Sequence, residues 1–141
     1  MLPKTRSDTH TSELDIELLL AHVLGAPRVH LYSWPDKTLT DLQCANFFNL
    51  LTRRAADEPL AYLTGKREFW SLELRVTTDV LIPRPETELL VELALERIPP
   101  DAAWRIADLG TGSGAIALAL AREYPRCCVV ATDISAAALT V

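Results

Sequence analysis

Apolar residues recur every three or four positions through the first part of the chain, which is the spacing of amphipathic helices. Two capping boxes, Ser12–Asp15 and Thr40–Gln43, mark helix starts, because their side chains can bond the orphan amides of a first turn. Gly25 stops the first helix, and a short helical turn can run from Pro59 to Gly65. The apolar positions expected to face the core are Leu14, Leu18, Ala21 and Leu24, then Cys44, Phe47, Phe48, Leu51 and Ala55. The pattern predicts a small helical bundle over residues 12–65.

The period then changes to that of a strand. Apolar and charged residues alternate from Leu72 to Val76, which predicts a half-buried strand. The residues from Lys66 onward supply its partner, in a β-hairpin whose turn lies near Trp70–Ser71. The stretch Leu81–Pro85 must be extended, because each proline disfavours helix at the residue before it. Helical spacing returns over residues 86–98.

The last part of the chain predicts a βαβ unit with a parallel pair of strands, so the fold class is α/β. Its parts are a strand at 104–109, a glycine loop at 110–114, a helix at 115–123 and a strand at 129–133, with Ser135 as the cap of a further element. Two parallel strands make a poor sheet, and a piece below about 40 residues rarely folds alone. We therefore expect the chain to be the front part of a longer protein.

Composition narrows the class of protein. The chain has 141 residues, a formal net charge of −5, 49% hydrophobic and 23% charged residues, which excludes a largely disordered chain. The longest apolar run, Ala115–Ala121, is far shorter than the roughly 20 residues of a membrane-spanning helix. The acidic balance argues against direct binding of nucleic acid through a broad basic face.

The cysteines predict neither disulfides nor metal. Their number is odd, and Cys127 and Cys128 are adjacent, so that on a strand their side chains point to opposite faces. We interpret these two and Cys44 as reduced thiols in the core of a cytoplasmic protein. No histidine has a partner at ligand spacing, so we assign no metal site.

The glycine loop is the main candidate for chemistry. Gly110, Gly112 and Gly114 stand between a strand and a helix, where missing Cβ atoms and free helix amides suit a nucleotide or nucleoside. The simpler interpretation is a glycine-rich turn that only connects the two elements. Asp133, on the next strand, can accept hydrogen bonds from ribose hydroxyls.

Two ligand classes compete for this loop. Gly110, Gly112 and Ala115 satisfy the relaxed dinucleotide fingerprint, and the same layout serves S-adenosylmethionine. Asp108 favours S-adenosylmethionine, because a carboxylate at the strand end would repel a pyrophosphate and attract the ammonium group of a methionine moiety. A role for Asp108 in capping the loop amides stays open.

Three stretches carry a resemblance to a known family. Asp108-Leu-Gly-Thr-Gly-Ser-Gly-Ala-Ile-Ala-Leu-Ala-Leu-Ala121 is similar to the first motif of class I methyltransferases. Glu58-Pro-Leu-Ala-Tyr-Leu-Thr-Gly-Lys-Arg-Glu-Phe-Trp70 and Leu81-Ile-Pro-Arg-Pro-Glu-Thr-Glu88 resemble the HemK family, as does Leu14–Trp34. Members of that family methylate the glutamine side-chain amide in the Gly-Gly-Gln motif of peptide chain release factors.

The resemblance implies a layout and a set of site residues. Residues 1–65 would be a helical substrate-recognition domain, 66–85 a β-hairpin and proline-rich linker, and 86–141 the first part of a Rossmann-like domain that binds S-adenosylmethionine. The implied cofactor-binding residues are Asp108, Gly110, Thr111, Gly112, Ser113, Gly114 and Asp133. Glu86 and Thr87 would lie near the cofactor edge, although they equally fit a rigid linker and a helix start. The partners would be release factors, and the full-length enzyme would be a cytoplasmic monomer.

The chain departs from the family pattern at two places. The family has an Asn-Pro-Pro-Tyr motif that grips the target amide, and no such motif occurs here. The resemblance therefore implies no catalytic residue in this chain, and we expect these 141 residues alone to be inactive. Asp57 stands where members often have glycine, which affects only the local turn. Two other functions remain as alternatives, an NAD-dependent oxidoreductase and a non-catalytic module that binds release factors.

Overall fold

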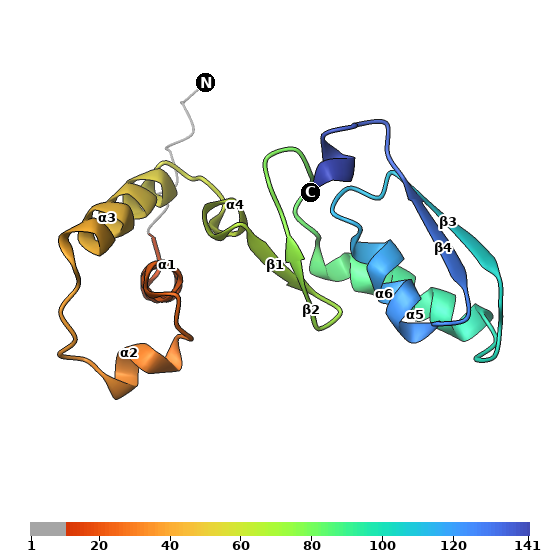
Figure 1. Ribbon diagram of the computed structural model, residues 1–141, viewed down its shortest axis with the longest axis horizontal. Helices are drawn as coiled ribbons and strands as arrows, with labels where there is room; N and C mark the ends of the chain where they lie inside the picture. The colour runs from red at the N-terminus through yellow and green to blue at the C-terminus, as the bar shows by residue number, and fades with distance from the viewer. Residues whose placement is uncertain (1–10) are drawn as a thin grey trace, which may run out of the picture. The chain divides into compact units, whose positions relative to one another are not determined.

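The computed structural model describes residues 11–141, which form two compact units (Figure 1). Unit 1 ends at Thr64, and unit 2 runs from Gly65 to Val141. Unit 1 is helical and contains α1 (Glu13–Leu24), α2 (Val29–Ser33), α3 (Asp41–Ala55) and α4 (Leu60–Thr64). Unit 2 mixes strands and helices: β1 (Lys66–Phe69), β2 (Leu72–Arg75), the 3-10 turn η1 (Pro85–Thr87), α5 (Glu88–Arg97), β3 (Arg105–Leu109), α6 (Ala115–Glu123), β4 (Cys128–Thr132) and the 3-10 turn η2 (Ala138–Thr140). No helix in the described part of the chain is long and apolar enough to cross a membrane.

Both predicted capping boxes of unit 1 are confirmed. The Ser12 hydroxyl accepts from the Asp15 amide at 3.1 Å, and the Thr40 hydroxyl accepts from the Gln43 amide at 3.2 Å. In each box the second side chain accepts from the amide of the first residue, so two orphan donors are satisfied at each helix start. Gly25 ends α1 in the left-handed conformation, as predicted.

The predicted buried faces of these helices are partly wrong. Leu14 is 47% exposed, whereas Leu19, which the pattern left outside the stripe, is completely buried. The reason is that α1 packs against α2, α3 and α4, so its buried face is broader than one stripe and turned toward Leu19. On α3 no residue is fully buried, and Phe48 is 61% exposed. The five-residue helix α2 was not predicted.

Asp57, the residue that stands where the family often has glycine, has φ 68°. A side chain in this left-handed region strains the backbone, and glycine adopts it without that cost. We therefore expect Asp57→Gly to raise the free energy of unfolding of unit 1 by about 0.5–1 kcal/mol. The measurement is urea unfolding followed by the fluorescence of Trp34, the tryptophan of this unit.

The neighbouring substitution Ala56→Gly is the matched control. Ala56 has φ −88°, so glycine relieves no strain there and adds only backbone entropy to the unfolded chain. Its expected effect is a loss of about 0.5–1 kcal/mol. A destabilised Asp57→Gly variant would show that the aspartate holds the turn by its side chain.

The β-hairpin of unit 2 has the predicted position and turn. Strands β1 and β2 are antiparallel, with Lys66 opposite Arg75 and Phe69 opposite Leu72. Trp70 and Ser71 form the two-residue turn, with φ 52° and 54°, as a type I′ turn requires. Neither residue is glycine, so the turn is strained by about 1–2 kcal/mol per residue.

Three polar side chains hold this strained turn against the helices of unit 2. Glu88 accepts from the Trp70 amide at 2.8 Å, and Glu123 accepts from the Trp70 indole N–H at 2.8 Å. Arg122 donates to the backbone carbonyls of Trp70 at 3.3 Å and Ser71 at 3.2 Å. The turn is thus fixed to the start of α5 and to the end of α6.

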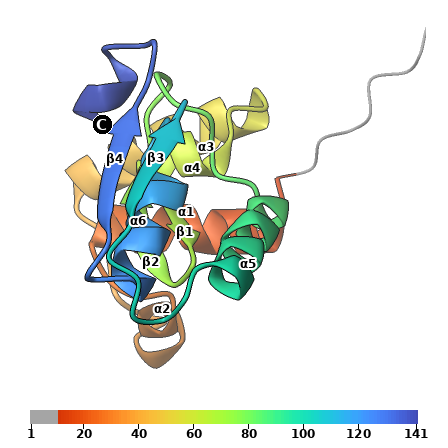
Figure 2. The same ribbon diagram turned by 90° about the vertical axis from the view of Figure 1, so that its right-hand side faces the viewer.

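The βαβ unit is also confirmed. Strands β3 and β4 are parallel, with Arg105 opposite Cys128 and Leu109 opposite Thr132. Helices α5 and α6 lie on one face of this pair (Figures 1 and 2). Helix α6 has the predicted bounds, whereas the predicted helix at 86–98 is a 3-10 turn followed by α5. Pro85 stands at the start of this turn, where its missing N–H is one that has no intrahelical acceptor in any helix.

The core of unit 2 lies between the hairpin and the two helices. Its buried members are Phe69, Leu74, Val91, Ala115, Ala119 and Leu120. Phe69 is 2% exposed, and Trp70 packs against the cluster. All three cysteines are free. The expectation that they lie in the core is wrong for Cys128, which is exposed at the start of β4, whereas Cys44 and Cys127 are half-buried and Cys127 packs against a buried cluster of Ile98, Ala102 and Tyr124. Among residues 11–141, no three histidine, cysteine, aspartate or glutamate side chains are placed to hold a metal ion.

Candidate cofactor site

The glycine loop, residues 110–114, lies at the carboxyl ends of two parallel strands, where α/β sheets bind their ligands (Figure 2). The amides of Gly110 and Thr111 both donate to the Thr132 carbonyl, at 2.8 and 2.9 Å, so the loop is tied to the end of β4. All three glycines have positive φ, between 55° and 79°. A Cβ atom at Gly110 or Gly112 would meet nothing within 4 Å, so the backbone conformation is the reason for glycine there.

Asp108 reaches from β3 into the loop and to the helix. Its Oδ2 atom accepts from the Thr111 hydroxyl at 2.7 Å and from the Ala117 amide at 3.2 Å. Ala117 lies in the first turn of α6, whose N-cap, Gly114, has no side chain to satisfy that amide. Asp108 therefore caps α6 from a distance, and it bonds this helix amide rather than the loop amides that the sequence suggested. The other oxygen, Oδ1, has no hydrogen bond to any residue between 11 and 141.

Asp133 closes the loop from the other strand. Its Oδ2 atom accepts from the Gly112 amide and its Oδ1 atom from the Ser135 amide, both at 2.9 Å. These two bonds, that of Ser135 the stronger cause, hold the pKa of Asp133 below its ordinary value. A carboxylate has about four lone-pair sites, so Asp133 can still accept from a ligand while it holds the loop.

The lowered pKa of Asp133 predicts a pH dependence of the loop. Because folding depresses this pKa, the two amide contacts stabilise the fold above the unfolded value near pH 4, and they are lost as the pH falls through the folded value. We expect the amide resonances of Gly112 and Ser135 to titrate together, with an apparent pKa below about 3.9. The Asp133→Asn variant should lose this titration. A midpoint above pH 4.5 would show that the amides do not hold the charged carboxylate.

The other predicted site residues have fewer hydrogen bonds at the glycine loop. Thr111 bonds Asp108, and Ser113 is a half-buried residue of the loop. Glu86 is exposed and Thr87 half-buried in η1, and in the described part of the chain no hydrogen bond joins either of them to the loop. The structure thus brings together Asp108, the loop and Asp133, and within residues 11–141 no hydrogen bond joins Glu86 or Thr87 to them.

One residue at the site was missed from the sequence. Ile134 directly follows Asp133 and its side chain is fully exposed, at 104%. An exposed branched apolar side chain beside an acidic group provides a surface for the flat face of a base, next to acceptors for a sugar. The signal was an isoleucine after the strand-ending aspartate. The predicted cap Ser135 is confirmed, since its hydroxyl accepts from the Ala138 amide at 3.2 Å.

The site as a whole offers acceptors and an apolar surface rather than reactive groups. Asp108 and Asp133 can accept from an ammonium group and from hydroxyls, and the carboxylate of Asp108 beside the loop disfavours a pyrophosphate. This arrangement can bind and orient a cationic nucleoside.

Comparison with known proteins gives two family matches and a set of curated relatives. Residues 5–65 match the PrmC N-terminal domain, and residues 86–141 match the methyltransferase small domain. The release factor glutamine methyltransferase of Escherichia coli is 56% identical over 119 residues, 84% of this chain and 43% of its own length. Those of Coxiella burnetii and Aliivibrio fischeri are 53% and 50% identical over 93% and 92% of this chain, and 47% and 45% of their own lengths. The chain thus spans about half the length of the curated relatives it matches. Within that span, its sequence is similar to those of release factor glutamine methyltransferases, at 50–56% identity.

Proposed function

We propose that this chain supplies the cofactor site and a substrate-recognition domain of an S-adenosylmethionine-dependent methyltransferase. The substrate is the glutamine side-chain amide in the Gly-Gly-Gln motif of peptide chain release factors, in the cytoplasm. The observation that carries the proposal is the pair of carboxylates, Asp108 and Asp133, on either side of a glycine loop at the ends of parallel strands. The names of the relatives support the substrate, and unit 2 would be the first part of a Rossmann-like domain.

The donor set of the loop fits S-adenosylmethionine. Oδ1 of Asp108 would accept from the ammonium group of the methionine moiety, and the remaining lone pairs of Asp133 would accept from the ribose hydroxyls. Ile134 would pack on the adenine, and residues 110–114 would line the cofactor. When bound, the cofactor supplies a methyl group on a positively charged sulfur atom.

The residues of this chain would bind and orient the cofactor. We assign none of them to the alignment of the target amide. An amide nitrogen is a poor nucleophile, because its lone pair is delocalised, so positioning against the methyl group is most of such catalysis. What unit 2 contributes is a fixed cofactor: Asp108 and Asp133 are themselves held by amides and a hydroxyl of the chain, so their geometry exists before the ligand arrives. Unit 1 would contribute recognition of the release factor.

Calorimetric titration with S-adenosylmethionine and with NADH tests the proposal. We expect S-adenosylmethionine to bind and NADH to give no heat of binding, because the carboxylate of Asp108 beside the loop opposes a pyrophosphate. Binding of NADH alone would favour an oxidoreductase. Binding of neither would mean that the glycine loop is only a connection between β3 and α6.

A further inference from the structure

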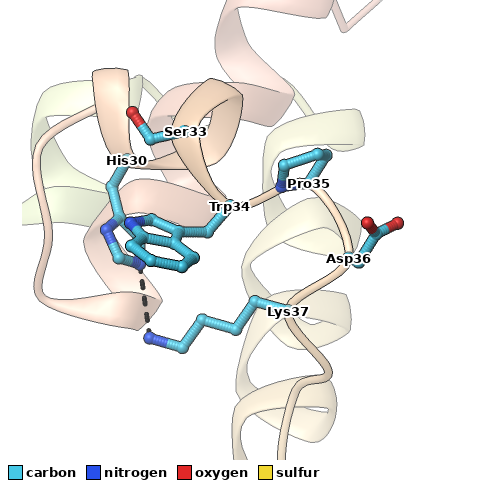
Figure 3. Close-up of a pocket in the computed structure, with 6 residues that line it drawn as sticks. All are labelled: His30, Ser33, Trp34, Pro35, Asp36 and Lys37. Carbon is cyan, nitrogen blue, oxygen red and sulfur yellow. Dashed lines mark hydrogen bonds between the residues drawn. The ribbon is translucent and has the colours of Figure 1, made fainter.

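The end of α2 and the turn that follows it form a cavity in unit 1, and none of the residues that line it belongs to the candidate cofactor site (Figure 3). The cavity has a volume of about 540 Å³ and is lined by His30, Ser33, Trp34, Pro35, Asp36 and Lys37. Backbone hydrogen bonds fix the turn, from the Trp34 amide to the His30 carbonyl at 3.0 Å and from the Lys37 amide to the Trp34 carbonyl at 3.2 Å. The surface, named here the Trp34 cavity, is therefore largely formed in advance.

The main apolar group of the cavity is the exposed indole ring of Trp34. The Trp34 side chain is 64% exposed, although tryptophan is a residue that folding usually buries. Exposed tryptophan is enriched at the centres of protein interfaces, where it supplies a large contact area with few rotamers to freeze. Pro35 also lines the cavity and adds a rigid apolar group to it.

Its polar groups near the indole are donors. The Lys37 ammonium nitrogen lies 3.3 Å from Nε2 of His30, which uses one of its three donors. Among residues 11–141, no carboxylate lies within ion-pair distance of Lys37, and the Trp34 indole N–H has no acceptor. The Asp36 carboxylate points away from both side chains (Figure 3). A ligand for this cavity must therefore bring an anionic acceptor.

Charge decides which kind of anion fits. Between residues 11 and 64 the chain has seven Asp and Glu but only four Lys and Arg, and Lys37 is the one Lys or Arg among the residues that line the cavity. This described part of unit 1 therefore offers a partner for a single carboxylate, but no row of cations for a nucleic-acid backbone. We propose that the Trp34 cavity docks an acidic segment of the protein substrate, with a carboxylate on Lys37 and an apolar side chain on the Trp34 indole. That the substrate is a release factor rests on the function proposed above; the chemistry of the segment rests on the cavity.

Binding of a purified peptide chain release factor to the 141-residue chain tests the proposal, with biolayer interferometry as the readout. Trp34→Ala and Lys37→Glu should each weaken the affinity by about tenfold or more. Trp104→Ala and Arg126→Glu are the matched controls, since Trp104 is 51% exposed and Arg126 is exposed, both in unit 2. The controls should stay within about twofold, and circular dichroism should show unchanged helix content in all four variants.

Each result decides the matter. Equal affinity of Trp34→Ala, Lys37→Glu and the controls, or no binding of the release factor to the unaltered chain, would overturn the proposal. So would tight binding of a short single-stranded RNA that Trp34→Ala abolishes. Titration of the same variants with S-adenosylmethionine separates the two hypotheses. Loss of release-factor affinity in a chain that binds no cofactor would leave the docking surface standing and the cofactor site rejected. Intact cofactor binding with unchanged release-factor affinity in the variants would support the cofactor site and reject the docking surface.

Discussion

Replacing Phe69 with alanine is expected to lower the free energy of unfolding of unit 2 by about 3–5 kcal/mol. The Phe69 ring is 2% exposed and lies in the cluster that joins the hairpin to α5 and α6. Its removal leaves a cavity among rigid neighbours, Val91 and Ala119, both completely buried. The measurement is urea unfolding followed by Trp70 fluorescence, in a background with Trp34 and Trp104 changed to phenylalanine.

Leu89→Ala is the control for this prediction, because Leu89 is 56% exposed on α5. Its expected effect lies within about 0.5 kcal/mol, as for other surface positions. A loss below about 1 kcal/mol for Phe69→Ala would show that the cluster collapses around the missing ring, or that the hairpin does not rest on the helices.

Asp133→Ala should weaken the binding of S-adenosylmethionine by about ten- to a hundredfold. Two losses add in this variant. The ribose loses its charged acceptor, and the Gly112 and Ser135 amides lose the partner that holds the loop. The affinity is measured by isothermal titration calorimetry at neutral pH, where Asp133 is ionised.

Two further variants separate these losses. Asp133→Asn keeps one carbonyl oxygen for the loop but removes the charge, so we expect an intermediate affinity. Asp101→Ala removes an exposed acidic residue elsewhere in unit 2 and should leave the affinity unchanged. If Asp133→Ala binds the cofactor as well as the unaltered chain, Asp133 is not the ribose ligand.

The elements that local signals define were predicted with the right bounds or nearly so. Helix α6 is the clearest case, because Gly114 precedes it, Pro125 follows it and an unbroken apolar run lies between. The hairpin turn followed from period-two alternation after Trp70–Ser71, and the capping boxes followed from residue type at fixed spacing.

The elements that depend on contacts distant in sequence were not predicted. Helix α2 has no side-chain cap, and its side chains are held from α1: Glu17 accepts from Arg28 and from the Tyr32 hydroxyl. The pattern of apolar residues within 29–33 cannot predict a hydrogen bond to Glu17, which lies in another helix. The buried side of α1 likewise depends on three neighbouring helices.

The candidate site also combines features that the sequence predicts with features that only the folded chain fixes. Sequence spacing places Asp108 and Asp133 at the ends of two strands, and parallel pairing brings those ends together. Which oxygen of Asp108 caps α6 and which stays available is fixed only by the path of the loop, and the exposure of Ile134 is fixed by the end of β4.

The strained turn at Trp70–Ser71 and the glycine loop stand at opposite ends of the same helix. Arg122 and Glu123 grip the turn at the end of α6, and Gly114 joins the loop to its beginning. Nine residues of α-helix make a stiff rod of about 13 Å. We therefore expect a tilt of the hairpin at one end of α6 to shift the glycine loop at the other end. Through these contacts, a displacement of the hairpin would reach the site along the backbone of α6.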